Sequence, residues 1–208
     1  AFVGREAERE RLEALHADVA AGEPRAFYVE AESGGGKSRL LQELAIRAKL
    51  QGALVLRASC EEAEGGPHAT VGALVEEAFA SAPEEAGRAS RPDAPLLARV
   101  FDAVREAHPG VALESEVGEP AEDRMRLQAA VHGFFRRLAQ ERVVVALVDD
   151  VQRADEASAA ALAGLARSGL VGLLLGFARR LGESVRAPAA VASLAELEPR
   201  VRLGGLDP

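Results

Sequence analysis

Short apolar runs of strand length alternate along this chain with stretches in which apolar residues recur at helical spacing. The apolar runs lie at 26–31, 53–58, 143–148, 170–177 and 200–203. Helical periodicity follows the first run over 37–50 and precedes the third over 122–140, which predicts amphipathic helices there. Strands separated by helices are typical of parallel crossovers, so the pattern predicts an α/β domain built on a parallel sheet.

Two stretches show no periodicity of either kind. Residues 81–95 carry three prolines with mixed charge, and residues 108–120 carry prolines, glycines and glutamates. Both are predicted to be exposed loops. The rest of the 208 residues, of which 48% are hydrophobic and 28% charged, suit a single domain over 1–208 with one substantial core.

A helix start is marked at Asp155, which precedes the alanine-rich stretch 156–165. A carboxylate in that place accepts hydrogen bonds from the first backbone amides of the helix. Asp155 is therefore predicted to be an N-cap and not a catalytic residue.

The use of lysine singles out one glycine-rich turn. Only Lys37 and Lys49 are lysines among the 25 basic residues, and Lys37 lies in the sequence Ser-Gly-Gly-Gly-Lys-Ser over 33–38, between a predicted strand and a predicted helix. Unpaired amides and the positive dipole end at a helix N-terminus attract anions. A compact ammonium reaches between phosphate groups where a wide guanidinium does not fit. The pattern favours a bound nucleoside triphosphate; the structural alternative is a tight turn with Lys37 in solvent.

The spacing departs from the usual phosphate-loop pattern of glycine, four residues, glycine, lysine and serine or threonine. Its first position is Ala31, and because alanine resists a positive φ, this change is expected to tighten the turn. The nucleotide-binding residues predicted in this segment are Ser33, Gly34, Gly35, Gly36, Lys37, Ser38 and Arg39.

A pair of acidic residues follows the apolar run 143–148, at Asp149 and Asp150. The carboxyl end of a parallel strand is where open α/β sheets place their ligands. Ser38 and Asp149 are predicted to hold Mg²⁺, and Asp150 to polarise the attacking water. The alternative is that both aspartates only close the strand as turn residues.

Three segments, 2–8, 33–41 and 147–158, together resemble the ATPase module of STAND proteins, which are signal-transduction relatives of the AAA+ class. The resemblance is closest to modules of bacterial LuxR-type regulators and of multidomain kinases or cyclases. It covers nearly the whole chain. The chain departs from the family pattern at Ala31, which replaces a glycine, and at Arg153, where these modules often carry tryptophan. It implies a three-layer P-loop NTPase sandwich with a central five-stranded parallel sheet in the order 5-1-4-3-2 and helices on both faces.

The resemblance also implies further site residues. Backbone contacts to adenine would come from Val3 and Gly4, with Arg5 near the base; ordinary core packing is the alternative for the opening segment. An arginine at the end of the strand after the acidic pair would sense the terminal phosphate. Arg179 is the first choice and Arg180 the second, and a surface arginine pair is the alternative.

The function implied is an ATP-binding and slowly hydrolysing switch, with ATP, ADP and Mg²⁺ as ligands, in a multidomain signalling or transcription regulator. A helical lid and a winged-helix domain follow the last strand in similar proteins and are absent from 1–208, so the chain is expected to be an excised piece. The resemblance leaves open a nucleotide-dependent oligomer. Two other readings remain open: a nucleotide-free scaffold that holds partners, and a small-molecule kinase.

Charge and cysteine content limit the kinds of partner and the cell compartment that the sequence suggests. A net charge of -8 and a pI near 5.2 argue against direct binding of nucleic acid by this domain, which needs a basic surface. No apolar stretch reaches the ~20 residues of a membrane helix. The single cysteine, Cys60, cannot form an internal disulfide, in agreement with the cytoplasm.

Overall fold

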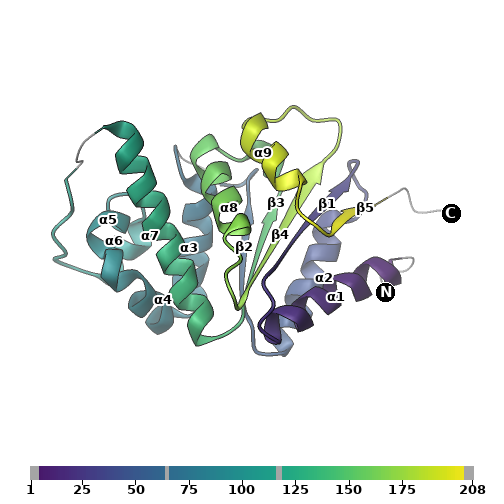
Figure 1. Ribbon diagram of the computed structural model, residues 1–208, viewed down its shortest axis with the longest axis horizontal. Coiled ribbons are helices and arrows are strands. Elements are labelled where there is room, and N and C mark those ends of the chain that lie inside the picture. Colours follow the sequence, from purple (N-terminus) through teal and green to yellow (C-terminus); the bar gives the residue numbers. More distant parts are fainter. Residues whose placement is uncertain (1–4, 64–65, 116–118, 204–208) are drawn as a thin grey trace.

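The computed structural model describes residues 5–63, 66–115 and 119–203. Its centre is a five-stranded sheet in which every described pairing is parallel, in the order β2-β3-β4-β1-β5. The strands are β1 (Arg25–Ala31), β2 (Leu54–Ser59), β3 (Val144–Asp149), β4 (Leu173–Arg180) and β5 (Arg200–Arg202). Read from the other edge, this is the predicted order 5-1-4-3-2, with β4 inserted between β1 and β3 (Figure 1).

Helices cover both faces of the sheet, as predicted. Because side chains alternate along a strand, β1 sends Phe27 and Val29 into the core on one face and Tyr28 into the core on the other. The first core is closed by α1 (Glu6–Ala20) and α2 (Lys37–Leu50). The second is closed by α3 (Ala69–Ser81), α7 (Pro120–Glu141), α8 (Glu156–Arg167) and α9 (Pro188–Ala195). Figure 1 shows the three layers.

The prediction of an exposed loop at 81–95 is wrong. This stretch forms α4 (Pro83–Ser90), the 3₁₀ turn η1 (Arg91–Asp93) and α5 (Ala94–Leu97), followed by α6 (Asp102–Ala107). Each of its three prolines lies in the first turn of an element, where the missing N–H has no helical partner to lose. Ala86 and Ala89 are buried, and Arg137 of α7 donates to the carbonyl of Ala89 and pairs with Asp93.

The second predicted loop agrees with the structure where it is described. Residues 108–115 contain neither helix nor strand and are largely exposed, and α7 begins at Pro120. The predicted helix 122–140 is confirmed as α7. Among the described residues, no helix is long and apolar enough to cross a membrane.

Asp155 caps α8 as predicted, and it does more. Its Oδ1 accepts from the backbone amide of Ser158 at 2.8 Å and from that of His68 at 2.9 Å, and its Oδ2 accepts from the amide of Thr70 at 3.5 Å. The carboxylate therefore joins the start of α8 to the start of α3. Burial opposes its ionisation, but these hydrogen bonds outweigh that effect and lower the pKa of Asp155.

Replacing Asp155 with alanine should lower the free energy of unfolding by about 3 kcal/mol, because a cap is lost and two further amides lose their partner. Glu156→Ala, one residue further along at an exposed position, is the matched control and should change it by less than about 0.5 kcal/mol. Urea unfolding measures both. Since the pKa of Asp155 is lowered on folding, the difference should be present above the ordinary Asp pKa and vanish as the pH falls through the folded-state value. Equal effects of the two variants would contradict the double cap.

Candidate functional site

The glycine turn connects the carboxyl end of β1 to the first turn of α2. Gly34 has φ 76° and Gly36 has φ 86°, a left-handed backbone that favours glycine. Gly36 is the N-cap of α2, and no side chain caps the helix. The first amides of α2 are therefore left to an anion, and the helix dipole favours one there.

Ala31 lies before the left-handed part of the turn. It is the last residue of β1, where its backbone is extended, and it pairs with Arg180 of β4. The tight position is Gly35, because a Cβ added there would stand 2.6 Å from the Cβ of Ala31. Alanine at 31 is thus accommodated as long as residue 35 is glycine.

Lys37 is folded back against this turn. Its side chain is buried, with 6% of the residue exposed, and its Nζ donates to the carbonyl oxygens of Ala31 at 3.4 Å and Glu32 at 3.3 Å. Burial lowers the pKa of Lys37, while the charges of Asp149 and Asp150 act in the opposite direction. The turn is therefore built around a desolvated cation, which differs from the alternative of a lysine in solvent.

The acidic pair lies at the carboxyl end of β3, between β2 and β4. Asp149 ends the strand, and its Oδ1 accepts from the amide of Asp150 at 2.9 Å. Asp150 has a left-handed backbone, with φ 53° and ψ 42°, which is uncommon for a non-glycine residue and clusters at functional sites. Its side chain is buried, accepting at Oδ1 from Gln152 Nε2 at 3.1 Å and at Oδ2 from Arg180 Nη2 at 3.4 Å.

The two arginines after the fourth apolar run point to different places. The run was predicted to end at residue 177, but β4 begins only at Leu173, after a turn at Gly172 with φ 80°, and continues to Arg180. As neighbours in a strand, the two side chains take opposite faces. Arg180 meets Asp150, whereas Arg179 lies across from Glu30, with Nη1 3.7 Å from its Oε1. The structure therefore brings Arg180, the second choice, to the acidic pair, and leaves Arg179 away from it.

Three further polar side chains belong to this network and were not assigned a role from the sequence. Glu183 accepts from Arg180 at 3.0 Å, from Gln152 at 3.1 Å and from Arg153 at 3.2 Å. Glu61 pairs with Arg153 at 3.2 Å and with Arg180 at 3.8 Å. Gln152 could have been noted for its place beside the acidic pair, but no local pattern marks the two glutamates. Together they edge a groove of about 760 Å³.

The remaining predicted nucleotide-binding residues are placed as follows. Val3 and Gly4 lie outside the described residues. Arg5 is the N-cap residue of α1 and is buried, with its Nη1 3.2 Å from Oε1 of Glu8.

Four predicted residues of the glycine turn are exposed, where a ligand can reach them: Ser33, Gly34, Ser38 and Arg39. Their contacts with a nucleotide stay predictions.

Metal binding by protein groups alone finds no support, since no cluster of three or more His, Cys, Asp or Glu in the described part of the chain could hold an ion. The hydroxyl of Ser38 and the carboxylate of Asp149 are oxygen donors, the kind that Mg²⁺ prefers, and Mg²⁺ commonly takes only one or two protein ligands beside substrate phosphates. The donor set therefore fits Mg²⁺ that arrives with a nucleotide.

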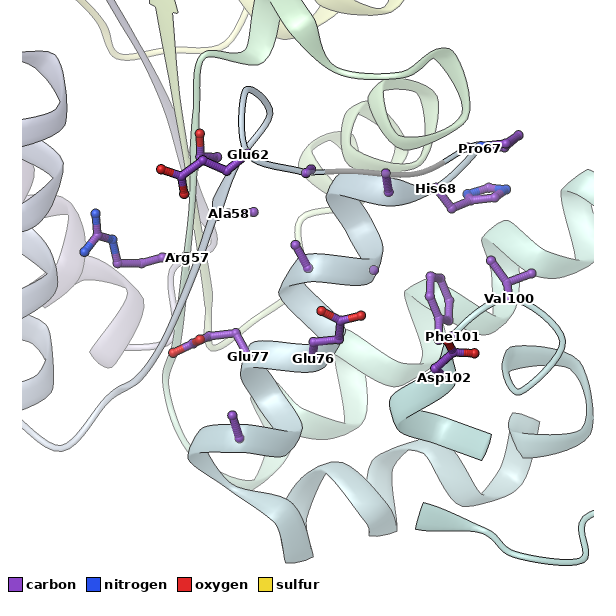
Figure 2. A pocket seen from close by; sticks show the side chains of 17 residues that line it. Arg57, Ala58, Glu62, Pro67, His68, Glu76, Glu77, Val100, Phe101 and Asp102 are labelled. Carbon is purple, nitrogen blue, oxygen red and sulfur yellow. The ribbon is translucent and has the colours of Figure 1, made fainter. Parts of the chain in front are cut away.

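A second groove, of about 750 Å³, runs along the outer face of α3. Figure 2 shows Glu76 and Glu77 of α3 on one side of it, Phe101 and Asp102 on another, and Arg57 of β2 at its edge. No residue of the glycine turn or of the acidic pair lines this groove. It meets the groove beside the acidic pair at Ala63, which lines both.

The sheet order, with the glycine turn before α2 and the acidic end of β3 at its carboxyl edge, is the fold of a P-loop NTPase. The family comparison is narrower: residues 1–175 match the AAA ATPase domain, and the chain belongs to that family. It is thus an AAA+-related ATPase module. No curated protein matches the sequence at a significant level.

A solved structure agrees with this fold. A chain in the structure of Drosophila ORC bound to DNA is 20% identical with a TM-score of 0.51, over 97% of this chain and 42% of that one. A chain in the structure of the Aeropyrum pernix ORC1 protein in complex with DNA is 19% identical with a TM-score of 0.43, over 98% of this chain and 46% of that one. The present chain spans less than half the length of either.

Proposed function

We propose that this domain binds ATP with Mg²⁺, hydrolyses it slowly, and acts as the nucleotide switch of a multidomain signalling or transcription regulator. One observation carries the proposal. The buried ammonium of Lys37 lies at the uncapped N-terminus of α2, close enough to Asp149 and Asp150 for their charges to act on it. A polyanion and a divalent cation placed there would meet a complement for each charge.

The roles follow from the positions. Amides of residues 33–39 and the ammonium of Lys37 would hold the phosphates, and Ser38 and Asp149 would hold Mg²⁺, which when bound offsets phosphate charge. Asp150 would polarise the attacking water. We assign the phosphate-sensing role to Arg180 and not to Arg179, because only Arg180 contacts Asp150, and a guanidinium there can stabilise charge on the terminal phosphoryl group.

The base would be covered by the opening segment, Val3, Gly4 and Arg5. A lid and a winged-helix domain of the parent chain would then read the nucleotide. A ligand shifts a conformational equilibrium only by its differential affinity for the two states, so ATP and ADP must contact those domains differently. A nucleotide-dependent oligomer and a place in the cytoplasm, consistent with the unpaired Cys60, belong to the same proposal.

Direct binding of nucleic acid is not part of the proposal. The solved structures named above contain DNA bound to those proteins, but at 20% identity or less they speak only to the fold. The net charge of -8 is unfavourable for phosphate contacts with a duplex. A gel-shift titration with duplex DNA at physiological salt should show no complex at micromolar protein.

Calorimetric titration of the purified domain with ATP and Mg²⁺ tests the proposal. A single saturable site is expected, and at a ligand concentration of 100 Kd the bound nucleotide should stabilise the fold by about 2.7 kcal/mol. Release of inorganic phosphate measures turnover. A protein that shows neither heat of binding nor a thermal shift with ATP or ADP would instead be the nucleotide-free scaffold. Transfer of phosphate to an added small molecule, in place of its release, would indicate a kinase.

A further inference from the structure

Gln152 is the centre of the polar network beside the acidic pair. Gln152 is fully buried, with 0% of its surface exposed. Its Oε1 accepts from the backbone amide of Arg180 at 3.0 Å, and its Nε2 donates both to Oδ1 of Asp150 and to Oε2 of Glu183 at 3.1 Å. A buried amide has two donors and a carbonyl acceptor, and here every part of it is used.

These contacts fix which way the amide group faces. The backbone N–H of Arg180 can only donate, so it must meet the carbonyl oxygen of Gln152. The NH₂ group is then directed at the two carboxylates, which can only accept when ionised. The amide cannot turn over without setting two donors against each other and two acceptors against each other, so its orientation is determined by the backbone of β4.

The fixed orientation of the Gln152 amide constrains the side chain of Asp150. Its left-handed backbone lies in a sparsely populated region that persists only when surrounding contacts hold it. One carboxylate oxygen is held by Gln152, and the other by the guanidinium of Arg180. If Arg180 turns to a terminal phosphate, Oδ2 becomes free to accept a proton while Oδ1 stays fixed.

We propose that Gln152 is the positioning residue that aims Asp150 at the attacking water. This rests on the proposed ATPase function and goes beyond it. In the reaction, water gives a proton to Oδ2 of Asp150 while its oxygen bonds to the terminal phosphorus. The bond from that phosphorus to the ADP oxygen breaks, ADP and phosphate leave, and the proton returns to solvent. Gln152 touches none of the reacting atoms and acts by holding Oδ1.

Gln152→Met removes the amide but keeps the length and unbranched shape of the side chain. Turnover should fall about 10- to 100-fold, the scale expected when a reacting group is misplaced by about 1 Å. The Kd for ATP with Mg²⁺ should stay within about threefold, because Gln152 does not contact the glycine turn. A purely structural role would raise Kd along with lowering kcat, whereas the positioning role predicts a loss in kcat while Kd is kept. The melting temperature falls in both cases, because the Arg180 amide loses its acceptor, so the split between kcat and Kd decides.

Two further variants complete the test. Gln152→Glu keeps the acceptor for the Arg180 amide but, when ionised, loses both donors. Its kcat should fall at least as far at a pH where the introduced carboxyl is ionised, and it decides the question if Gln152→Met does not fold. Gln140→Met makes the same change at an exposed position near the end of α7 and should leave kcat unchanged. The inference is overturned if either Gln152 variant keeps the parent kcat, or if the loss appears in Kd. Failure of the parent protein to bind ATP would refute the proposed function itself.

Discussion

Lys37→Ala should weaken binding of ATP with Mg²⁺ at least about 100-fold, an effect of about 2.7 kcal/mol. The ammonium is already desolvated and lies over the turn, with Nζ 3.4 Å and 3.3 Å from two of its carbonyl oxygens. A bound phosphate would replace these weak neutral partners with charge-assisted hydrogen bonds, which are roughly twice as strong. Calorimetric titration measures the change in Kd.

The fold itself should survive the substitution. Alanine has a higher helix propensity than lysine in the first turn of α2, and no charge is left behind without a close ion pair, since Lys37 pairs with backbone carbonyls and not with a carboxylate. The melting temperature of the nucleotide-free variant should therefore stay near that of the parent. A loss of binding that came with unfolding would not support the proposed role.

The chain offers its own matched control, since Lys49 is the only other lysine. It lies on the same helix, α2, at the exposed far end. Lys49→Ala removes the same charge about three turns away and should change Kd by less than about twofold, as expected for an exposed charge screened by salt. If Lys37→Ala binds ATP as well as Lys49→Ala does, the turn is not a phosphate site and the proposed function fails.

The three inner strands could be predicted from the sequence because each is a largely apolar run buried on both faces, whereas the edge strands β2 and β5 keep exposed positions. Such runs are conspicuous whatever packs against them, and all five observed strands overlap the predicted runs. Their ends were harder to place. The predicted run 170–177 starts before the observed strand, because its first residues form a turn that ends at Gly172. A turn and a strand that are both made of leucine, valine and glycine cannot be told apart by sequence pattern.

The helices over 83–97 escaped prediction for a different physical reason. Prolines usually mark breaks in helices, but in this stretch each one lies in the first turn of a helical element. The buried face is made of alanines such as Ala86 and Ala89, whose small side chains give a weak periodic signal. What holds these helices is tertiary contact with α7, including Arg137, and such contacts are invisible to local pattern.

The candidate site also has parts that the sequence predicts and parts that only the structure reveals. Its glycine turn and acidic pair have fixed local spacing, and the structure places both at the carboxyl edge of the sheet. Glu61 and Glu183 come from other connections and join only because β2, β3 and β4 are neighbours. The choice between the two arginines depended on a strand end that pattern could not locate to one residue, and one residue reverses the face.

Asp150→Asn should lower phosphate release at least about 100-fold while ATP binding stays within about threefold of the parent. The substitution keeps the size and planarity of the side chain, but an amide oxygen cannot take the proton of the attacking water, and general-base contributions are typically about 10²- to 10⁴-fold. It also removes the negative charge that Arg180 meets at 3.4 Å. In the nucleotide-free protein, that arginine keeps Glu183 at 3.0 Å, so it remains paired.

Matched substitutions at two other carboxylates distinguish a role in chemistry from a role in metal binding. Asp149→Asn should reduce the Mg²⁺ dependence of binding as well as turnover, because Asp149 is proposed to hold the ion. Asp102→Asn, at an exposed position beside the second groove, should change neither. Single-turnover phosphate release with saturating ATP and Mg²⁺ separates chemistry from binding in all three. If Asp150→Asn turns over like the parent, Asp150 is a turn residue that only closes β3, and the hydroxide-forming step must belong to another group.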